Sequence, residues 1–355
     1  MALTDFWRGR RVFLTGHTGF KGAWLSLWLE RLGASVSAIA LPPQTSPSLY
    51  ALLSPWGDAD HHVGDIRDAA ALAAAMQAFA PEIVIHMAAQ ALVRPSYDDP
   101  AETFSTNVMG TVSLLDAVRH SPSVRAVLVV TSDKVYANDG SARAFVEGDP
   151  LGGADPYSSS KACTELVCRS YFKSFLRDRG VALATARAGN VIGGGDWAVD
   201  RLVPDFISAL EAGQPVQLRY PDAVRPWQHV LEPLGGYLAF AEALARTGGE
   251  GLPDALNFGP DPQAFATVAE LAEELGHAFG VEDHAWERAP GEWQAEAPVL
   301  TLSSALAGDV LGWHPRLDRG RTIEWTADWY KAYRDGTDMR DFTLHQIADY
   351  EEGAA

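Results

Sequence analysis

A glycine-spaced loop near the start of the chain constrains its fold most strongly. An apolar run at residues 11–14 leads into Thr-Gly-His-Thr-Gly-Phe-Lys-Gly at residues 15–22, and residues 20–32 carry apolar side chains at helical spacing. Glycine lets the backbone turn tightly, and the free N–H groups at the start of a helix attract a pyrophosphate. A strand, glycine-rich turn and helix in this order predict dinucleotide binding rather than a simple tight turn. The loop residues expected to contact the dinucleotide are Gly16, His17, Thr18, Gly19, Phe20, Lys21 and Gly22.

The first half of the chain alternates between strand and helix patterns. Helical spacing lies between most of the further apolar runs, which are residues 36–41, 83–87, 124–131 and 181–186. Strands that alternate with helices need right-handed crossovers, which place helices on both faces of a parallel sheet. The pattern therefore predicts an α/β fold with a Rossmann-type, doubly wound parallel sheet.

Glycine and proline become frequent after about Gly193, where we expect a smaller C-terminal substrate-binding lobe to begin. Residues 231–246 have a helical pattern and residues 255–258 a strand pattern, so the chain is expected to return to the sheet there. The predicted division is residues 1–192 with about 231–260 for the dinucleotide domain, and residues 193–230 with 261–355 for the smaller lobe.

The formal charge of -18 argues against nucleic-acid and anionic-membrane partners, because a negative field repels phosphate groups. An anionic small molecule would need a local basic pocket, and the candidates are Arg187, Arg201, Arg219 and Arg225. No segment approaches the roughly 20 apolar residues of a membrane helix, and no signal-peptide pattern is present, so a cytoplasmic location is expected.

No metal site is predicted. Cys163 and Cys168 are five residues apart, a spacing that fits neither a CxxC site nor a disulfide framework. His17, His86 and His229 belong to separate motifs and do not form a ligand set.

Tyr157 and Lys161 are four residues apart, which places both side chains on one face of a helix. Such a pair is common by chance in amphipathic helices, but here it follows a dinucleotide loop. With Gly-x-x-Gly-x-x-Gly at residues 16–22, Gly-Asp-Ile at 64–66 and His-Met-Ala-Ala-Gln at 86–90, it resembles the extended short-chain dehydrogenase/reductase family.

The resemblance implies roles for these residues. Cofactor contacts are expected at Asp65, Ile66, Ala88, Ala89, Gln90, Tyr157 and Lys161. Asn107 matches the asparagine that braces a helix in this family, the alternative being an ordinary polar residue. Tyr157 would take a proton, which requires its pKa to fall by about three units, or roughly 4 kcal/mol, through a neighbouring ammonium and the nicotinamide ring.

The cofactor is expected to be NAD on the strength of this resemblance. Dinucleotide domains commonly bind the adenosine ribose through a carboxylate near the end of the second strand. Here that position reads Ala-Leu-Pro-Pro at residues 40–43, so the residues themselves leave NADP open.

The segment after the fifth strand predicts the reaction class. Ser132 matches the family's Ser or Thr that bonds the sugar's 4-hydroxyl, and Asp133 and Lys134 resemble the branch that dehydrates CDP-glucose. Elimination of water needs a base at carbon 5 and an acid at the carbon 6 hydroxyl, assigned to Lys134 and Asp133. Lys134 serves only when neutral, so its pKa must fall. The alternative is an exposed ion pair in a loop.

Two longer stretches support the same branch and predict a nucleotide-sugar pocket. Residues 187–197 and 219–230 resemble signatures of CDP-glucose 4,6-dehydratases, with Asn190 and Arg225 as phosphate ligands and Arg201 and Arg219 completing the clamp. An arginine fork suits phosphate oxygens. The small lobe departs from the pattern at residues 302–307, which bears on base recognition.

Two other functions stay open on the residues alone. An epimerase or reductase on this scaffold would use Ser132, Tyr157 and Lys161 without an acid and base beside them, and a non-catalytic dinucleotide sensor would need none of these.

The resemblance implies deoxysugar biosynthesis, including that of lipopolysaccharide O-antigen. Apolar residues on several faces of 103–118 and 162–175 indicate a partner surface, and the resemblance implies a homodimer or homotetramer.

Overall fold

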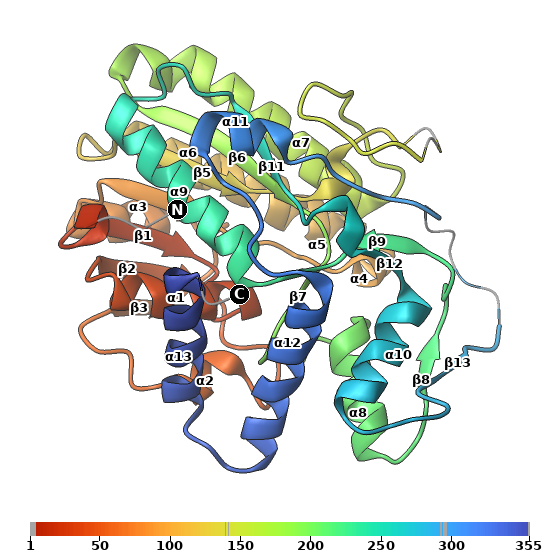
Figure 1. The fold of residues 1–355 in the computed structure, drawn as a ribbon. Helices are drawn as coiled ribbons and strands as arrows, with labels where there is room; N and C mark the ends of the chain where they lie inside the picture. The colour runs from red at the N-terminus through yellow and green to blue at the C-terminus, as the bar shows by residue number, and fades with distance from the viewer. Residues whose placement is uncertain (1–4, 139, 141, 292, 294–296, 354–355) are drawn as a thin grey trace.

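A parallel sheet forms the centre of the molecule (Figure 1). The computed structural model describes residues 5–138, 140, 142–291, 293 and 297–353. Its sheet has seven strands in the order β11-β6-β5-β4-β1-β2-β3, and every neighbouring pair is parallel. The strands are β1 (Arg11–Thr15), β2 (Ser35–Ala40), β3 (Asp60–Val63), β4 (Ile83–His86), β5 (Ala126–Val130), β6 (Ala182–Ala188) and β11 (Ala255–Phe258). This order confirms the predicted doubly wound fold.

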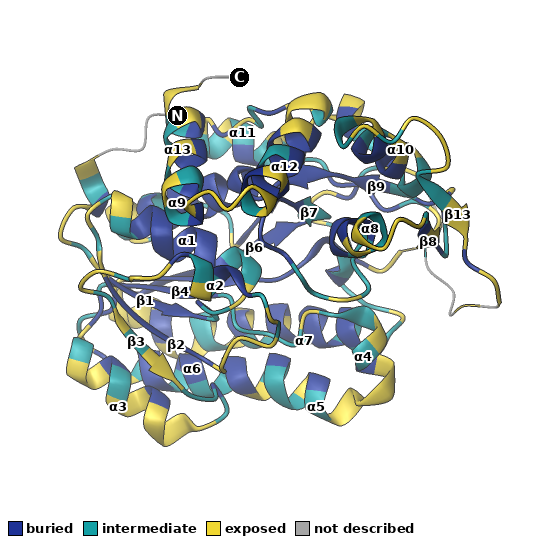
Figure 2. Cartoon of the chain, turned by 90° about the horizontal axis from the view of Figure 1, so that it is seen from below, coloured by how far each residue is buried: buried dark blue, intermediate teal, exposed yellow. Residues whose placement is uncertain are grey.

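Helices cover both faces of the sheet (Figure 2). Within β1, Val12 and Leu14 join the core on one face and Phe13 joins the core on the other, because side chains alternate along a strand. A strand covered on both sides therefore reads as a continuous apolar run. One face carries α1 (Phe20–Arg31), α9 (Leu231–Thr247) and α13 (Met339–Glu352), and the other carries α3 (Ala69–Phe79), α6 (Gly110–Arg119) and α7 (Pro156–Tyr171).

A smaller group of elements lies beside the carboxyl ends of β5 and β6, at the lower right of Figure 1. It contains α8 (Leu202–Glu211), α10 (Val268–Ala278), the parallel pair β8 (Val216–Leu218) and β13 (Trp286–Arg288), and the antiparallel pair β9 (Val224–Pro226) and β12 (Phe265–Thr267). The remaining elements are α2 (Leu49–Leu52), α4 (Val93–Asp98), α5 (Pro100–Phe104), α11 (Ala305–Leu311), α12 (Arg319–Arg334), β7 (Val191–Ile192) and β10 (Gln228–His229).

The chain crosses between the two groups of elements more than once. β11 pairs with β6, and α9 packs on β5, so residues beyond 231 rejoin the sheet. α13 packs on α1, where Tyr350 meets Trp28 edge-on with ring centroids 5.6 Å apart. Among the described residues, no helix has the length and apolarity that crossing a bilayer requires.

A buried ionic cluster joins α7 to β5 and β6. Glu165 on α7 accepts two hydrogen bonds from Arg187, at 2.8 and 2.9 Å, and one each from Thr131 and Thr185, at 2.6 and 2.7 Å. The Arg187 and Glu165 side chains are 0% and 3% exposed. Because a buried charge is costly without its partner, this cluster holds α7 and the ends of β5 and β6 in one arrangement.

Replacing Glu165 by glutamine should lower the free energy of unfolding by about 3 kcal/mol, because Arg187 would keep a buried, unbalanced charge. Urea unfolding at pH 7 measures this. The double variant E165Q/R187M should recover part of the loss. R321Q, which breaks an exposed pair with Glu324, is the control and should cost under about 1 kcal/mol. A cost for E165Q no larger than that of R321Q would contradict the prediction.

Candidate active site

The glycine loop is packed too closely for side chains at two positions. Gly16 has a φ of +84°, and a Cβ there would lie 2.7 Å from the main-chain nitrogen of Ala88. A Cβ at Gly22 would lie 2.0 Å from the Gly16 carbonyl oxygen. α1 begins after Gly19, and no side chain caps its first N–H groups. The loop therefore leaves main-chain donors at a helix N-terminus, which fits the pyrophosphate of a dinucleotide.

A string of buried hydrogen bonds fixes the loop against the end of β4. The Thr15 hydroxyl lies 2.7 Å from Nδ1 of His86, and Nε2 of His86 lies 3.1 Å from the Thr111 hydroxyl. The main-chain N–H of Ala88 donates to the Thr15 oxygen at 3.1 Å. Burial lowers the pKa of His86 to about 3, so the ring is neutral and braces the strand ends.

Asn107 braces the segment that follows β4. It lies in a π-helical turn, Ser105–Met109, between α5 and α6. Its Oδ1 accepts from the Gln90 main-chain N–H at 2.8 Å, and its Nδ2 donates to the Gln90 carbonyl at 3.0 Å and to the Ser160 hydroxyl at 2.8 Å. Asn107 thus ties Ala88, Ala89 and Gln90 to α7, the helix that carries the tyrosine and lysine.

His17 and Thr18 contribute to the loop's structure through their side chains. His17 is buried, with its ring centroid 4.4 Å from that of His61 and 5.2 Å from that of Tyr50. Burial, together with His61, lowers the pKa of His17 to about 3, so the ring is uncharged. The Thr18 hydroxyl donates to the Leu41 carbonyl at 2.8 Å, at the end of β2.

Asp65 and Ile66 have different surroundings. The Asp65 carboxylate is bound by the Arg67 guanidinium, with Nε 3.0 Å from each carboxylate oxygen, and these hydrogen bonds hold the pKa of Asp65 below its ordinary value. The Ile66 side chain is buried, and a Cβ at Gly110 would lie 2.4 Å from its Cδ1. Asp65 is thus a charged, half-buried acceptor, whereas Ile66 offers a ligand only its main chain.

Ser132, Asp133 and Lys134 turn away from the end of β5 in a short 3₁₀ helix, Asp133–Val135. The Ser132 hydroxyl donates to Oδ1 of Asp133 at 3.0 Å. Burial raises the pKa of Asp133, although Lys134, Ser132, Arg225 and Lys21 act in the opposite direction. Oδ2 of Asp133 is buried without a hydrogen-bond partner among the described residues. The carboxyl group is therefore poised to carry a proton.

Gly189 makes room for this carboxyl group. A Cβ there would lie 2.5 Å from Cγ of Pro226 and 3.2 Å from Oδ2 of Asp133.

Tyr157 and Lys161 lie on α7 and are buried, as their spacing predicted for a shared helix face. Burial raises the pKa of Tyr157 to about 12, although a hydrogen bond with Ser132 acts in the opposite direction. This pKa differs from the low value expected from the sequence, because desolvation outweighs the effect of the neighbouring groups. Burial lowers the pKa of Lys161 to about 8, and its Nζ donates to the Val130 carbonyl at 3.2 Å.

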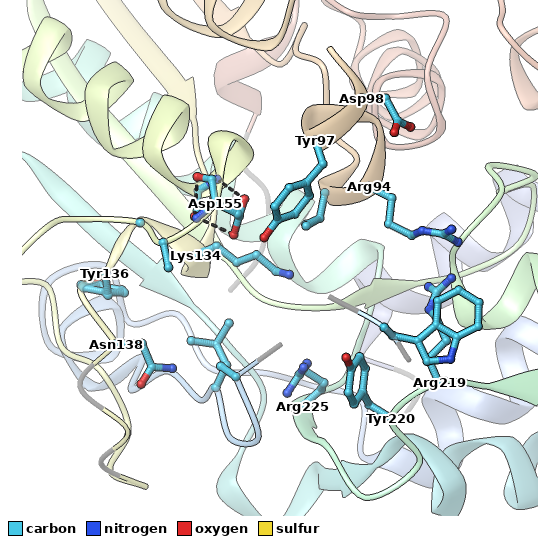
Figure 3. Close-up of a pocket in the computed structure, with 17 residues that line it drawn as sticks. Arg94, Tyr97, Asp98, Lys134, Tyr136, Asn138, Asp155, Arg219, Tyr220 and Arg225 are labelled. Carbon is cyan, nitrogen blue, oxygen red and sulfur yellow. Dashed lines mark hydrogen bonds between the residues drawn. The ribbon is translucent and has the colours of Figure 1, made fainter. Parts of the chain in front are cut away.

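A cavity of about 310 Å³ opens next to Lys134, whereas Ser132, Asp133, Tyr157 and Lys161 are not among the residues that line it (Figure 3). Lys134 points into it, with Arg225 and Tyr220 across from it. Its other lining residues are Val93, Arg94, Tyr97, Asp98, Tyr136, Asn138, Gly153, Ala154, Asp155, Ser158, Arg219, Trp293, Ala297 and Leu300. A concave site with convergent polar groups is the expected form of a small-molecule pocket.

The structure separates the four arginines proposed from the sequence. Arg219 and Arg225 line the cavity, whereas Arg201 and Asn190 do not. The prediction that Arg187 belongs to a basic pocket was wrong, because its side chain is fully buried against Glu165. Arg187 instead forms a buried ion pair with α7.

Arg201 lies on the tyrosine side of the site. It donates to Oδ2 of Asp196 at 2.8 Å, and its charge offsets a small part of the effect of burial, which raises the pKa of Tyr157. It also helps burial to lower the pKa of Lys21 to about 8. Asn190 is half-buried, and its carbonyl accepts from the Gln228 main-chain N–H at 3.1 Å.

Several cavity residues were not predicted from the sequence. Arg94 and Tyr97 come from α4, and Asp155 caps α7 by accepting from the Ser158 main-chain N–H at 2.9 Å. An Asp-Pro pair directly before Tyr157 was an available signal for that cap. Among the described residues, no group of three His, Cys, Asp or Glu side chains is placed to hold a metal ion.

Comparisons with known proteins identify the relatives of this chain. The chain is 46% identical over 351 residues to a CDP-glucose 4,6-dehydratase of Salmonella typhimurium, covering 98% of this chain and 97% of that protein. It is 28% identical over 337 residues to a dTDP-glucose 4,6-dehydratase of Xanthomonas campestris, covering 89% and 92% of the two chains.

The fold is shared with solved structures. A dTDP-glucose 4,6-dehydratase of Streptomyces venezuelae with NAD bound aligns with a TM-score of 0.80 at 23% identity, covering 92% of this chain and 98% of that one. The profile of the NAD dependent epimerase/dehydratase family matches residues 12–252. The chain therefore belongs to this family, as the resemblance to the extended short-chain dehydrogenase/reductases predicted.

Proposed function

We propose that this protein is an NAD-dependent CDP-glucose 4,6-dehydratase, a hydro-lyase that produces CDP-4-keto-6-deoxyglucose. The observation that carries the proposal is the buried carboxyl group of Asp133, which lies between Ser132 and the cavity-lining Lys134. The 46% identity to a CDP-glucose 4,6-dehydratase over nearly the whole chain supports the same reaction and substrate.

NAD is the cofactor that the residues fit. Gly16, Gly19 and Gly22 leave space and main-chain donors for its pyrophosphate, Asp65 offers an acceptor at the adenine end, and Lys161 would hold the nicotinamide ribose. When bound, NAD supplies the hydride acceptor for oxidation at carbon 4 and the hydride that is later returned to carbon 6.

Ser132 and Tyr157 handle the proton of the 4-hydroxyl group. Ser132 would bond this hydroxyl, and Tyr157 would take its proton as carbon 4 is oxidised. With a pKa of about 12, Tyr157 is protonated at neutral pH in the free protein. Its activation therefore depends on added positive charge near its hydroxyl, and Arg201 already acts in that direction.

Asp133 and Lys134 carry out the elimination. The 4-keto group makes the carbon 5 proton acidic, and Lys134 removes it while Asp133 gives a proton to the carbon 6 hydroxyl, which leaves as water. After hydride returns to carbon 6, Lys134 gives its proton back to carbon 5. Burial favours the protonated form of Asp133, which is the form an acid needs. An epimerase or reductase has no use for this pair.

We also propose the location, pathway, oligomeric state and domain division that the sequence predicts. These are a cytoplasmic location, a role in deoxysugar and O-antigen biosynthesis, a homodimer or homotetramer, and two lobes divided at about residue 193.

The direct test incubates the protein with NAD and CDP-glucose and records the alkali-induced absorbance of a 4-keto-6-deoxy sugar. UDP-glucose and dTDP-glucose run in parallel. We expect a CDP-selective signal without net NADH, since the hydride returns to the sugar. No signal with any glucose nucleotide, despite measured NAD binding, would refute the dehydratase.

Replacing the acid and the base should stop elimination while sparing the first oxidation. D133N and K134M should each lower the rate of 4-keto-6-deoxy product by about 100- to 10,000-fold. Both should still transfer deuterium from carbon 4 of labelled CDP-glucose to the cofactor, whereas Y157F should lose both activities. D328N, at an exposed carboxylate paired with Lys331, is the matched control. If D133N and K134M dehydrate the substrate at the full rate, Asp133 and Lys134 are not the acid and the base of the elimination.

The affinity for NAD should fall as pH rises through 8. Burial and Arg201 lower the pKa of Lys21 to about 8, and a bound pyrophosphate would raise it. The Lys21 ammonium group therefore contributes fully to NAD binding below pH 8. It loses its proton as the pH rises above 8, and the affinity for NAD should then fall by about 10-fold. Titration calorimetry between pH 6.5 and 9.5 measures this. K21M should bind more weakly at pH 6.5 and show a flatter profile; an unchanged profile would mean that Lys21 does not contact the cofactor.

A further inference from the structure

A pair of arginines from different parts of the chain meets at one side of the cavity (Figure 3). Arg94 belongs to α4, which packs on α7, and Arg219 follows β8. Both donate to Oδ1 of Asp200, at 2.5 and 2.7 Å. Both also pack on the Trp293 ring, with their guanidinium carbons 5.4 and 5.8 Å from its centroid. Arg94, Arg219 and Trp293 line the cavity, whereas Asp200, which binds the two guanidinium groups, is not among the lining residues.

Asp200 is held in place for this contact. Its φ of +62° lies in the left-handed region, which a non-glycine residue adopts only at a cost. Although burial raises it, hydrogen bonds from Arg219 and Arg94 hold the pKa of Asp200 below its ordinary value, so the carboxylate is charged. One anion and one aromatic ring therefore fix the direction of two guanidiniums.

The order of groups along the cavity indicates which part of a substrate these arginines meet. In the proposed function, the reacting sugar lies near Ser132 and Tyr157, at the side of the cavity that Lys134 lines. Arg225, which lies across the cavity from Lys134, is placed for the diphosphate. Figure 3 shows the Arg94 and Arg219 side chains close together and to one side of Lys134 and Arg225, which leaves them for the nucleoside half of the ligand.

We propose that Arg94 and Arg219 form a nucleobase subsite that selects cytosine over uracil and thymine, with Asp200 as their positioning residue. This rests on the proposed function, because it assumes a nucleotide-sugar with its sugar at Ser132. A guanidinium donates two parallel hydrogen bonds and so matches two adjacent acceptors. Cytosine presents such a pair, O2 and N3. Uracil and thymine carry an N3–H donor beside O2, which would face another donor.

The surroundings of the pair suit a base better than a phosphate. Asp200 already neutralises one of the two positive charges, which weakens the attraction for a dianion. Tyr97 and Tyr220 point their rings into the same cavity, and aromatic rings offer flat faces on which bases stack.

The test measures binding of CMP and UMP to the NAD-loaded protein by titration calorimetry, because these ligands report on the base without requiring catalysis. The natural chain should bind CMP about 10- to 100-fold more tightly than UMP. R94M and R219M should each weaken CMP binding with little change for UMP, and the double variant should bind both equally. R321Q, at an exposed arginine of α12, should leave the ratio unchanged.

R219K separates base reading from simple charge attraction. Lysine keeps the positive charge but lacks the planar fork, so the CMP-to-UMP ratio should fall in R219K as in R219M. D200N should lower the ratio and raise KM for CDP-glucose while leaving kcat unchanged, because the reacting carbons are distant from the base.

The proposal is overturned if the natural chain binds CMP and UMP equally, if the double variant weakens both nucleotides to the same extent, or if R219K keeps the full preference. Failure of the proposed function has a separate signature: no 4-keto-6-deoxy sugar forms from any glucose nucleotide, whatever the nucleotide binding shows.

Discussion

The parallel direction of the sheet strands is the constraint on which the site depends. Because all seven strands run the same way, their carboxyl ends meet at one edge. The glycine loop after β1, the small residues after β4, the Ser-Asp-Lys turn after β5 and the segment after β6 therefore converge, although they are far apart in the sequence. The close contact between Gly16 and Ala88 and the Thr15–His86 hydrogen bond hold two of these ends together. α7 adds Tyr157 and Lys161 from the side, fixed by Glu165.

Burial sets the protonation states at this edge more strongly than the neighbouring charges do. Asp133 is shifted toward its neutral form, Tyr157 stays protonated, and Lys161 is shifted toward neutrality. Each shift has the sign that desolvation demands. At neutral pH, Tyr157 therefore keeps its proton, and burial favours the neutral form of the Asp133 carboxyl group. In the function proposed above, the charges that substrate and cofactor bring would change this balance.

Local patterns made much of the architecture predictable. Residues 11–32 form a strand, turn and helix because apolar spacing and glycine placement act within a few residues, and Tyr157 and Lys161 share a face because a helix repeats every 3.6 residues. The role of Arg187 was not predictable, since its partner Glu165 lies 22 residues earlier on another element. The pKa of Tyr157 depends on burial, which only tertiary packing decides. Arg94 on α4 meets Asp200 and Trp293, which lie outside helices and strands, through tertiary packing alone, and no periodicity links the three residues.

The ion pairs of Asp200 also join two parts of the molecule. The two arginines come from α4 and from the loop after β8, so these ion pairs tie the sheet side of the molecule to the smaller group of elements. All three side chains keep between 23% and 43% of their surface in solvent. Partly exposed ion pairs are weak, of the order of 1 kcal/mol, and dissolved salt screens them. These ion pairs therefore contribute little to holding the two parts of the molecule together. Their contribution should fall further as ionic strength rises.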